Sequence, residues 1–461
     1  MPFSRLHALS ESRQQGDLKF DMKTKNLTEG PILKSLLIFF GPMLAGNLLQ
    51  QIYNFADALI VGRFVGANAL AAVGSTYTLM TFLTSVIIGL CMGSGAIFSA
   101  NFGAGKKQEM GNDIALSFLF IFSVTILLYL IIFPLTDPIL HLLQVPAEIY
   151  DMMRSYVRLV FYGIGFIFLY NFFANLMRAL GNAGIPLVFL GIASVVNIIL
   201  DLLLVIYFKC GVEGAAIATV ISQGLAGLGI AVYAYVKIPL LRHLRYDFHF
   251  DRQRMALIMR NDLATGMQQS VMNFGILMIQ GLVNSFGTVI MAAFAAAVKI
   301  DTIAYMPAQE FGNAYSLFIS QNYGAGKAGR IREGTKKAML TTTVFCLLIS
   351  GLVFVFARQL MCLFVERAET RIIAAGVSYL HIEGACYVGI GILFLWYGYY
   401  RGIQLPVMSL ILTIISLGSR VLLAYTLAPH TALGVFAIWM AIPIGWLLAD
   451  LTGYIIYKKR T

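Results

Sequence analysis

Charged side chains are scarce in this chain. Asp, Glu, Lys and Arg make up 12% of its 461 residues, whereas hydrophobic residues make up 59%. A soluble domain carries roughly 25% charged residues, so a soluble globular fold is excluded. The apolar residues gather in about twelve runs, and about 20 such residues are enough to cross a bilayer. The sequence therefore predicts an all-α, polytopic membrane protein surrounded by lipid.

Residues for metal, redox or nucleotide chemistry are also scarce. The five cysteines and six histidines are scattered, with no metal-ligand spacing and no redox pair. Two GAGK turns lack the longer pattern of a phosphate-binding loop. We therefore expect no enzyme activity, no metal site and no cofactor. Any active transport would have to use an ion gradient, with H⁺ or Na⁺ as the coupling ion.

A cleavable N-terminal signal is not evident either. Residues 1–30 are polar and lack an apolar core, so we expect a mobile cytoplasmic tail. Most Lys and Arg residues lie between spans on one side of the membrane, together with both termini. This pattern predicts cytoplasmic termini and explains the net charge of +11 without a nucleic-acid partner. The expected spans are 36–62, 69–100, 113–135, 156–177, 186–207, 213–236, 262–285, 288–321, 338–357, 377–400, 406–428 and 432–457.

The chain repeats itself. NFGAGK at 101–106 returns as NYGAGK at 322–327, an offset of 221 residues. Each half holds six spans, an even number, so the halves are expected to be parallel repeats about an axis along the membrane normal. We expect a first lobe at 31–237 (spans 1–6), a cytoplasmic linker at 238–260 and a second lobe at 261–461 (spans 7–12). Two such lobes would leave a cleft suited to alternating access.

Two carboxylates lie inside spans of the first half. A charged side chain at the centre of a membrane helix costs about 2.5 kcal/mol or more, so its default interpretation is functional. Asp57 shares one helix face with Gln50 and Asn54, and Asp201 shares a face with Asn197. Thr219 in the sixth span could join them.

The two acids lie at one depth. Asp57 follows Pro42 by fifteen residues, and Asp201 follows Pro186 by fifteen. If their spans are neighbours, both acids would share one pocket, where burial and mutual repulsion favour a protonated form. Ionised, the pair would attract a cation. This predicts proton or sodium coupling, with a purely structural, hydrogen-bonded role as the alternative.

We expect the second half to lack this pair. The positions opposite Asp57 are 276–278, and those opposite Asp201 are 420–422, with no acid among them. We therefore expect ion coupling to be confined to the first half. The second half offers four charges for substrate contact or gating, with structural pairing as the alternative: Lys299, Asp301, Glu310 and Arg420. Lys299 and Asp301 are two residues apart, so they should point to different helix faces.

A cavity for flat, greasy cations could use aromatic and methionine side chains. The candidates are Gln50, Tyr53, Asn54, Asn175 and Met177, with ordinary helix packing as the alternative.

Together these motifs resemble the multidrug and toxic compound extrusion (MATE) family, over about residues 30–457. The matching elements are the first span from Pro42 to Asp57 with VGRFVG at 61–66, both GAGK turns, MRALGNAGIP, NIILDLLL, GVEGAAIAT and the Arg401–Gly402 pair. One subgroup of the family places acids in spans 7 and 10. Here MQQSVMNFG and YVGIGILFLWYG carry none, so the chain resembles the DinF-like bacterial branch.

The resemblance implies twelve helices in two six-helix lobes that form a V. It implies an exporter of drugs, toxic organic cations or metabolites that exchanges them for H⁺ or Na⁺, as a monomer in the bacterial cytoplasmic (inner) membrane. Its coupling residues would be Asp57, Asn197 and Asp201, with Gln50, Tyr53 and Thr219 as neighbours.

A flippase for a lipid-linked or polysaccharide precursor is the alternative function. It would need a cavity lined by Arg and Lys to hold phosphates. The spans of the first half offer no basic cluster, and Lys299 and Arg420 are the only intramembrane cations of the second.

Overall fold

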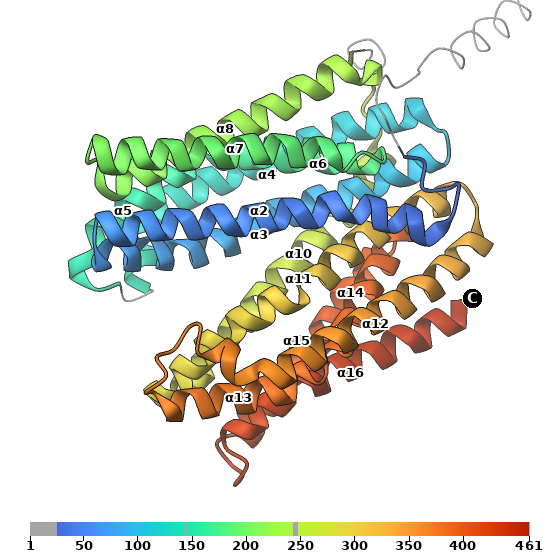
Figure 1. Ribbon diagram of the computed structural model, residues 1–461. Helices are drawn as coiled ribbons and strands as arrows, with labels where there is room; N and C mark the ends of the chain where they lie inside the picture. Colours follow the sequence, from blue (N-terminus) through green and yellow to red (C-terminus); the bar gives the residue numbers. More distant parts are fainter. Residues whose placement is uncertain (1–24, 143–144, 243–247, 461) are drawn as a thin grey trace, which may run out of the picture.

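The computed structural model describes residues 25–142, 145–242 and 248–460. Across this described part the chain is helical and contains no strand, so the all-α prediction is confirmed. The helices form two side-by-side bundles, which we call the N-lobe and the C-lobe (Figure 1). The N-lobe helices are α2 (Ile32–Phe64), α3 (Ala67–Gly103), α4 (Lys107–Leu142), α5 (Ala147–Tyr162), α6 (Ile164–Ala179), α7 (Gly184–Asp201), η1 (Leu202–Tyr207) and α8 (Gly211–Lys237).

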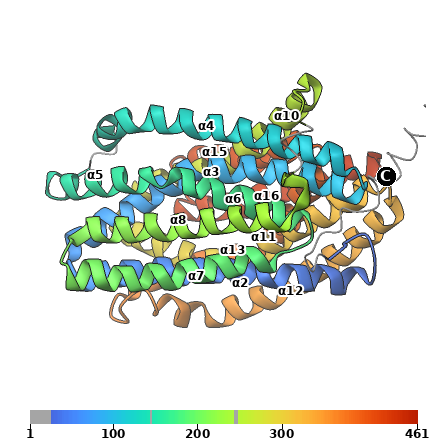
Figure 2. The same cartoon turned by 90° about the horizontal axis from the view of Figure 1, so that it is seen from above.

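The C-lobe repeats this series. Its helices are α10 (Arg252–Asn284), α11 (Thr288–Gly324), α12 (Ala328–Met361), α13 (Thr370–Gly384), α14 (Tyr387–Gly402), α15 (Pro406–Leu427) and α16 (Val435–Arg460). Both GAGK turns and the C-terminal Lys458 and Arg460 lie at one end of the molecule, which we call the basic end. Figure 2 shows the same long helices from above, running along one common direction.

Nine helices of the described chain are long and apolar enough to cross a membrane, and two bent helix pairs raise this number to eleven. The bent pairs are α5 with α6, at 45°, and α13 with α14, at 51°. The remaining predicted span, the seventh at 262–285, lies in α10, which is 33 residues long but more polar than those nine helices. Two of its polar side chains bond to the N-lobe: Asp262 accepts from Ser94, and Gln269 donates to Met92.

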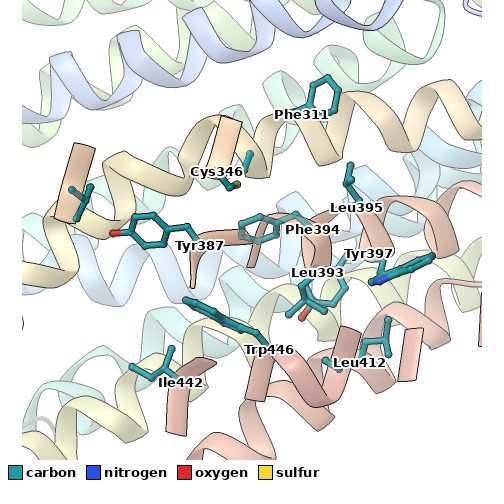
Figure 3. Packing of buried hydrophobic residues seen from close by; sticks show 14 of the residues in the cluster. Phe311, Cys346, Tyr387, Leu393, Phe394, Leu395, Tyr397, Leu412, Ile442 and Trp446 are labelled. Carbon is teal, nitrogen blue, oxygen red and sulfur yellow. The ribbon is translucent and has the colours of Figure 1, made fainter. Parts of the chain in front are cut away.

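Each lobe has its own hydrophobic core, and α2 belongs to both. Ile60 and Val61 lie in the C-terminal half of α2, which we call its outer half, and pack in the N-lobe core. Leu36 and Phe39 lie in the N-terminal half, which we call its inner half, and pack in the C-lobe core. Aromatic side chains fill that second core, among them Tyr387, Phe394 and Trp446 of α14 and α16 (Figure 3).

The first helix of the C-lobe, α10, does the reverse of α2: it reaches into the N-lobe and packs along α3. This contact is backbone to backbone. A Cβ placed at Gly89 would lie 2.6 Å from the Cα of Gly266, and one at Gly93 would lie 2.7 Å from the Cα of Asp262. Only glycine permits such an approach. The first helix of each lobe therefore contributes to the other lobe.

The two GAGK turns join the lobes at the basic end in a nearly symmetric contact. A Cβ at Gly103 would lie 1.9 Å from the carbonyl oxygen of Gln321. A Cβ at Gly324 would lie 1.8 Å from the carbonyl oxygen of Ala100. Each glycine is 221 residues from its counterpart, as are Ala100 and Gln321. The glycines that we assigned to tight turns thus also hold α3 against α11.

Two predicted boundaries are wrong. The tail was expected to extend through residue 30, and residues 1–24 lie outside the described part. Residues 25–30, however, are packed against both lobes, with Leu27 fully buried. The linker was expected to run to residue 260, but α10 begins at Arg252, because Asp251 caps it by accepting from the backbone N–H groups of Gln253 and Arg254.

Candidate functional site

The structure brings Asp57 and Asp201 into one region of the N-lobe. Their helices, α2 and α7, pack along each other. Gly46 and Gly191 face leucines of the opposite helix, which allows this close packing. Asp57 is 8% exposed and Asp201 is fully buried. Asp57 acts electrostatically on Asp201, as expected for two acids that share a pocket.

Several polar atoms of this site have no hydrogen-bond partner among the described residues. They are one carboxylate oxygen of Asp57, both oxygens of Asp201, and both side-chain polar atoms of Asn197. A buried polar group without a partner costs about 1–3 kcal/mol, and a charged group costs more. The site therefore has the donors and acceptors to hold protons, water or a small cation.

Tyr156 of α5 completes the site, and our sequence reasoning missed it. Its hydroxyl lies within hydrogen-bonding reach of both Asp57 and Thr219. Thr219 of α8 therefore joins the acids through Tyr156. A tyrosine in an apolar span carries little signal by itself, since it is common in packed cores. Only the packing of α5 against α8 reveals its role.

The backbone changes immediately after Asp201. The next six residues form a π-helical turn, η1, in which the N–H of Phe208 bonds to the carbonyl of Leu203. Such turns are rare and occur frequently at functional sites. The turn shifts the register of the helix directly beyond the second acid.

The predicted cavity residues fall into two groups. Gln50 is exposed, while Tyr53 and Asn54 are half-buried on α2. Met177 is fully buried in the N-lobe core, and Asn175 is buried against Gly95 of α3. Both residues pack between helices in this conformation, as the alternative of ordinary helix packing describes. Their place in a substrate cavity stays a prediction.

The C-lobe contains a second buried acid pair. Asp301 of α11 accepts a hydrogen bond from Tyr387 and lies within hydrogen-bonding reach of Tyr379 and Glu383. Arg420 of α15 is close enough to act electrostatically on both acids. Our expectation that the second half lacks such a pair is wrong. Glu383 lies on a different helix, α13, at the bend within the tenth span, so it is not at the position equivalent to Asp57 or Asp201 in the repeat.

Lys299 and Asp301 point to different sides of α11, as predicted. Lys299 is exposed and lines a cavity of about 440 Å³ with Phe364 and Glu366. Asp301 is only 2% exposed. Lys299 therefore has no part in the acid pair.

Glu310 lies where the lobes meet. Its carboxylate accepts from Asn313, which in turn accepts from Arg401. From the N-lobe, Asn47 lies within hydrogen-bonding reach and Arg178 acts on it electrostatically. Glu310 therefore links α11 and α14 of the C-lobe to α2 and α6 of the N-lobe.

Three further acids lie in the helices, and two of them, Asp113 and Asp262, are fully buried. Asp262 of α10 accepts from Ser94 of α3 at 2.7 Å, across the lobes. Asp113 pairs with Arg254 at 2.6 Å, near the basic end. One oxygen of Asp450 in α16 lacks a partner among the described residues. The same residues contain no group of three His, Cys, Asp or Glu side chains placed to hold a metal ion.

The MatE family model matches the chain twice, over residues 42–203 and 264–426, which is once per lobe. The chain is 30% identical to the probable multidrug resistance protein YpnP of Bacillus subtilis, over 95% of this chain and 97% of that protein. It is 23% identical to a FAD transporter of Shewanella oneidensis, over 94% and 96%. A crystal structure of MATE in the bent conformation superposes with a TM-score of 0.87, at 25% identity, covering 95% and 98%.

Proposed function

This chain belongs to the MatE family, and from this premise we propose that it exports small organic compounds in exchange for protons. It is a multi-pass membrane transporter, and the proposal concerns its substrate, its coupling ion and its cycle. Sodium is the alternative coupling ion. The cycle would be alternating access, in which the N-lobe and C-lobe rock about their contact.

One observation carries the proposal: the buried, unpartnered oxygens of Asp57 and Asp201. Two ionised acids at this burial would repel each other without a nearby cation to compensate. Bound protons remove that cost. An intramembrane acid pair that is stable only when protonated or occupied by a cation is a switch for an ion gradient.

The helix α2 would connect this switch to the cycle. Asp57 lies in its outer half, within the N-lobe. Asn47 lies in its inner half, near Glu310 of the C-lobe. A change in the charge of Asp57 therefore acts on a helix that contacts both lobes. Protonation of Asp57 can therefore affect the contact between the lobes through α2.

The substrates are proposed to be cationic or amphipathic organic molecules. Gln50, Tyr53 and Asn54 offer polar and aromatic groups on α2 that suit such molecules. YpnP is described as a probable multidrug resistance protein, while the Shewanella relative is described as a FAD transporter. The names therefore support an exporter of organic molecules and leave open which one this chain takes.

The flippase alternative gains no support from the site. The arginines between the lobes, Arg178 and Arg401, both act on Glu310. Their charge is partly compensated, which disfavours a phosphate site.

For orientation, we propose that the basic end faces the cytoplasm, since Lys and Arg are retained on that side. The protein would be a monomer in the bacterial inner membrane, with both termini in the cytoplasm.

Sealed proteoliposomes test the proposal. Efflux of a fluorescent lipophilic cation should follow an imposed pH gradient in the parent protein. A sodium gradient without a pH gradient separates the two coupling ions. Transport that ignores both gradients would contradict the proposal, and so would transport of an anionic lipid in preference to the dye.

A further inference from the structure

We propose that residues 25–30, which we call the strap, are a latch that holds the basic end of the two lobes closed. This inference rests on the proposed alternating access and adds a residue-level device to it. The strap precedes α2 and crosses the junction between the lobes. It would have to leave one lobe whenever the basic end opens.

The strap contacts the N-lobe at the turn between α6 and α7. The backbone N–H of Lys25 donates to the carbonyl of Gly181 at 3.1 Å. Gly181 has a left-handed backbone with φ of +82°, and a Cβ there would lie 2.1 Å from the carbonyl oxygen of Lys25. The turn therefore accommodates the strap only because residue 181 is glycine.

The contacts with the C-lobe are more numerous. The N–H of Leu27 donates to the side-chain oxygen of Gln321 at 2.9 Å. The carbonyl of Leu27 accepts from the side chain of Asn322 at 3.2 Å. The Leu27 side chain is fully buried and packs within the C-lobe core. A segment outside any helix thus has a buried anchor and satisfied backbone groups.

Two basic side chains of the C-lobe clamp the strap. Lys327 donates to the carbonyl of Thr28 at 2.9 Å. Arg330 donates to the carbonyls of Glu29 and Gly30, both at 2.8 Å. Hydrogen bonds from charged donors are stronger than neutral ones. The strap is therefore held more firmly by the C-lobe than by the N-lobe.

Gln321 joins all three parts. Its oxygen accepts from Leu27 of the strap, and its amide donates to the carbonyl of Ala179 of the N-lobe at 2.9 Å. Its backbone carbonyl lies against Gly103. Opening the basic end would break the bonds from Lys25 to Gly181 and from Gln321 to Ala179. The strap would then move with the C-lobe and the inner half of α2.

A cysteine at position 99 reports opening of the basic end. Ser99 is fully buried and donates to the carbonyl of Leu317 across the lobes at 3.0 Å. In a full-length protein whose five native cysteines are replaced by alanine, S99C should react with a soluble maleimide only when the lobes separate there. The reaction rate measures the open fraction in proteoliposomes and needs no transported substrate.

Gly181→Ala is the decisive variant, with Gly105→Ala as its matched control. Both glycines have a left-handed backbone, but nothing lies within 4 Å of a Cβ at Gly105. Both substitutions therefore place an alanine in a left-handed backbone conformation, but only Gly181→Ala also displaces the strap. We expect it to raise the S99C labelling rate about fivefold or more over the control, since each lost hydrogen bond changes an equilibrium by about that factor.

Arg330→Gln is the second variant, and it remains informative if Gly181→Ala fails to fold. It removes the clamp from the C-lobe side and should also raise labelling at least about fivefold, because its bonds are charge-assisted. Equal labelling in both variants and the control, with measurable labelling in the parent, would overturn the latch alone. No labelling in the parent under any gradient, while transport continues, would instead overturn alternating access.

Discussion

The two lobes share one repeat and both bury a pair of acids, but they differ in how the charge is compensated. In the N-lobe, Asp57 and Asp201 pair with no lysine or arginine of the described chain, and three of their four oxygens lack a partner. In the C-lobe, Asp301 and Glu383 lie near Arg420 and two tyrosines, although one oxygen of each acid also lacks a partner. The duplicated scaffold therefore holds one pair with no nearby cation and one pair whose charge a single arginine offsets in part.

The crossing helices differ as well. The contact of α10 with α3 is made through glycine backbones and the bond between Asp262 and Ser94. The contact of α2 with α11 is made through side chains, with Phe40 edge-on to Phe311 and Asn47 near Glu310. Contacts between side chains can separate by rotamer changes, whereas a backbone interface separates only when the helices move. The contact of α2, the helix that carries Asp57, is therefore the more adaptable of the two.

Exchanging one acid in each lobe gives the largest contrast. Asp57→Asn should abolish ion-coupled export, because a side-chain amide neither binds nor releases a proton near neutral pH. The matched variant Asp301→Asn should lower export by less than about tenfold, which is 1.4 kcal/mol. Both are measured as dye efflux in proteoliposomes, with size-exclusion profiles to confirm folding. Parent-like, gradient-driven export by Asp57→Asn would remove the proposed difference between the lobes.

The symmetric glycines should give equal effects. Gly103→Ala and Gly324→Ala each push a methyl group into a carbonyl of the other lobe, at a cost of about 1–3 kcal/mol to the closed contact. Export should fall about tenfold in both. Gly105→Ala and Gly326→Ala are the controls, since nothing lies within 4 Å of either position, and they should stay near the parent rate. Unequal losses for the first pair would mean that the contact is not symmetric in function.

The tyrosines that contact the acids offer a finer comparison. Tyr156→Phe removes a bond to Asp57 and should lower export about fivefold, since a typical hydrogen bond contributes about 1 kcal/mol. Tyr387→Phe removes the bond to Asp301 and should mainly lower thermal stability, by about 1–3 kcal/mol. Export rates and thermal melts are measured for both variants. If Tyr387→Phe lost export and Tyr156→Phe lost mainly stability, the coupling pair would have to lie in the C-lobe.

Lys299→Ala should have the smallest effect. Its side chain is exposed and lies away from Asp301, so stability should change by no more than about 0.5 kcal/mol. Export should remain near the parent rate for cationic dyes. A strong loss would assign the outer cavity of α11 a role in substrate passage.

Much of the fold could be predicted because membrane helices satisfy their backbone internally. Apolar runs therefore mark helices directly, and the repeated GAGK turns mark the duplication. The helix starts and bends were harder to predict. Gly163 and Ala385 interrupt two spans in ways that composition does not signal, and α10 begins ten residues before the start of its predicted span.

The site was predicted only where single residues were unusual. Asp57 and Asp201 stand out in apolar spans, and the structure places them together. Tyr156 and Glu383 escaped because their importance depends on neighbours from other helices. For Met177 the sequence could not distinguish a cavity lining from a helix core, since both are built from apolar side chains.

Sequence by itself determined the class of the protein, its repeat and the two acids of the N-lobe, since hydrocarbon tolerates few charges and few backbone solutions. Tertiary structure alone decided which charges are compensated and where the lobes touch. It also decided that residues 25–30 bind across the junction of the lobes, because such contacts join segments that are hundreds of residues apart in the chain.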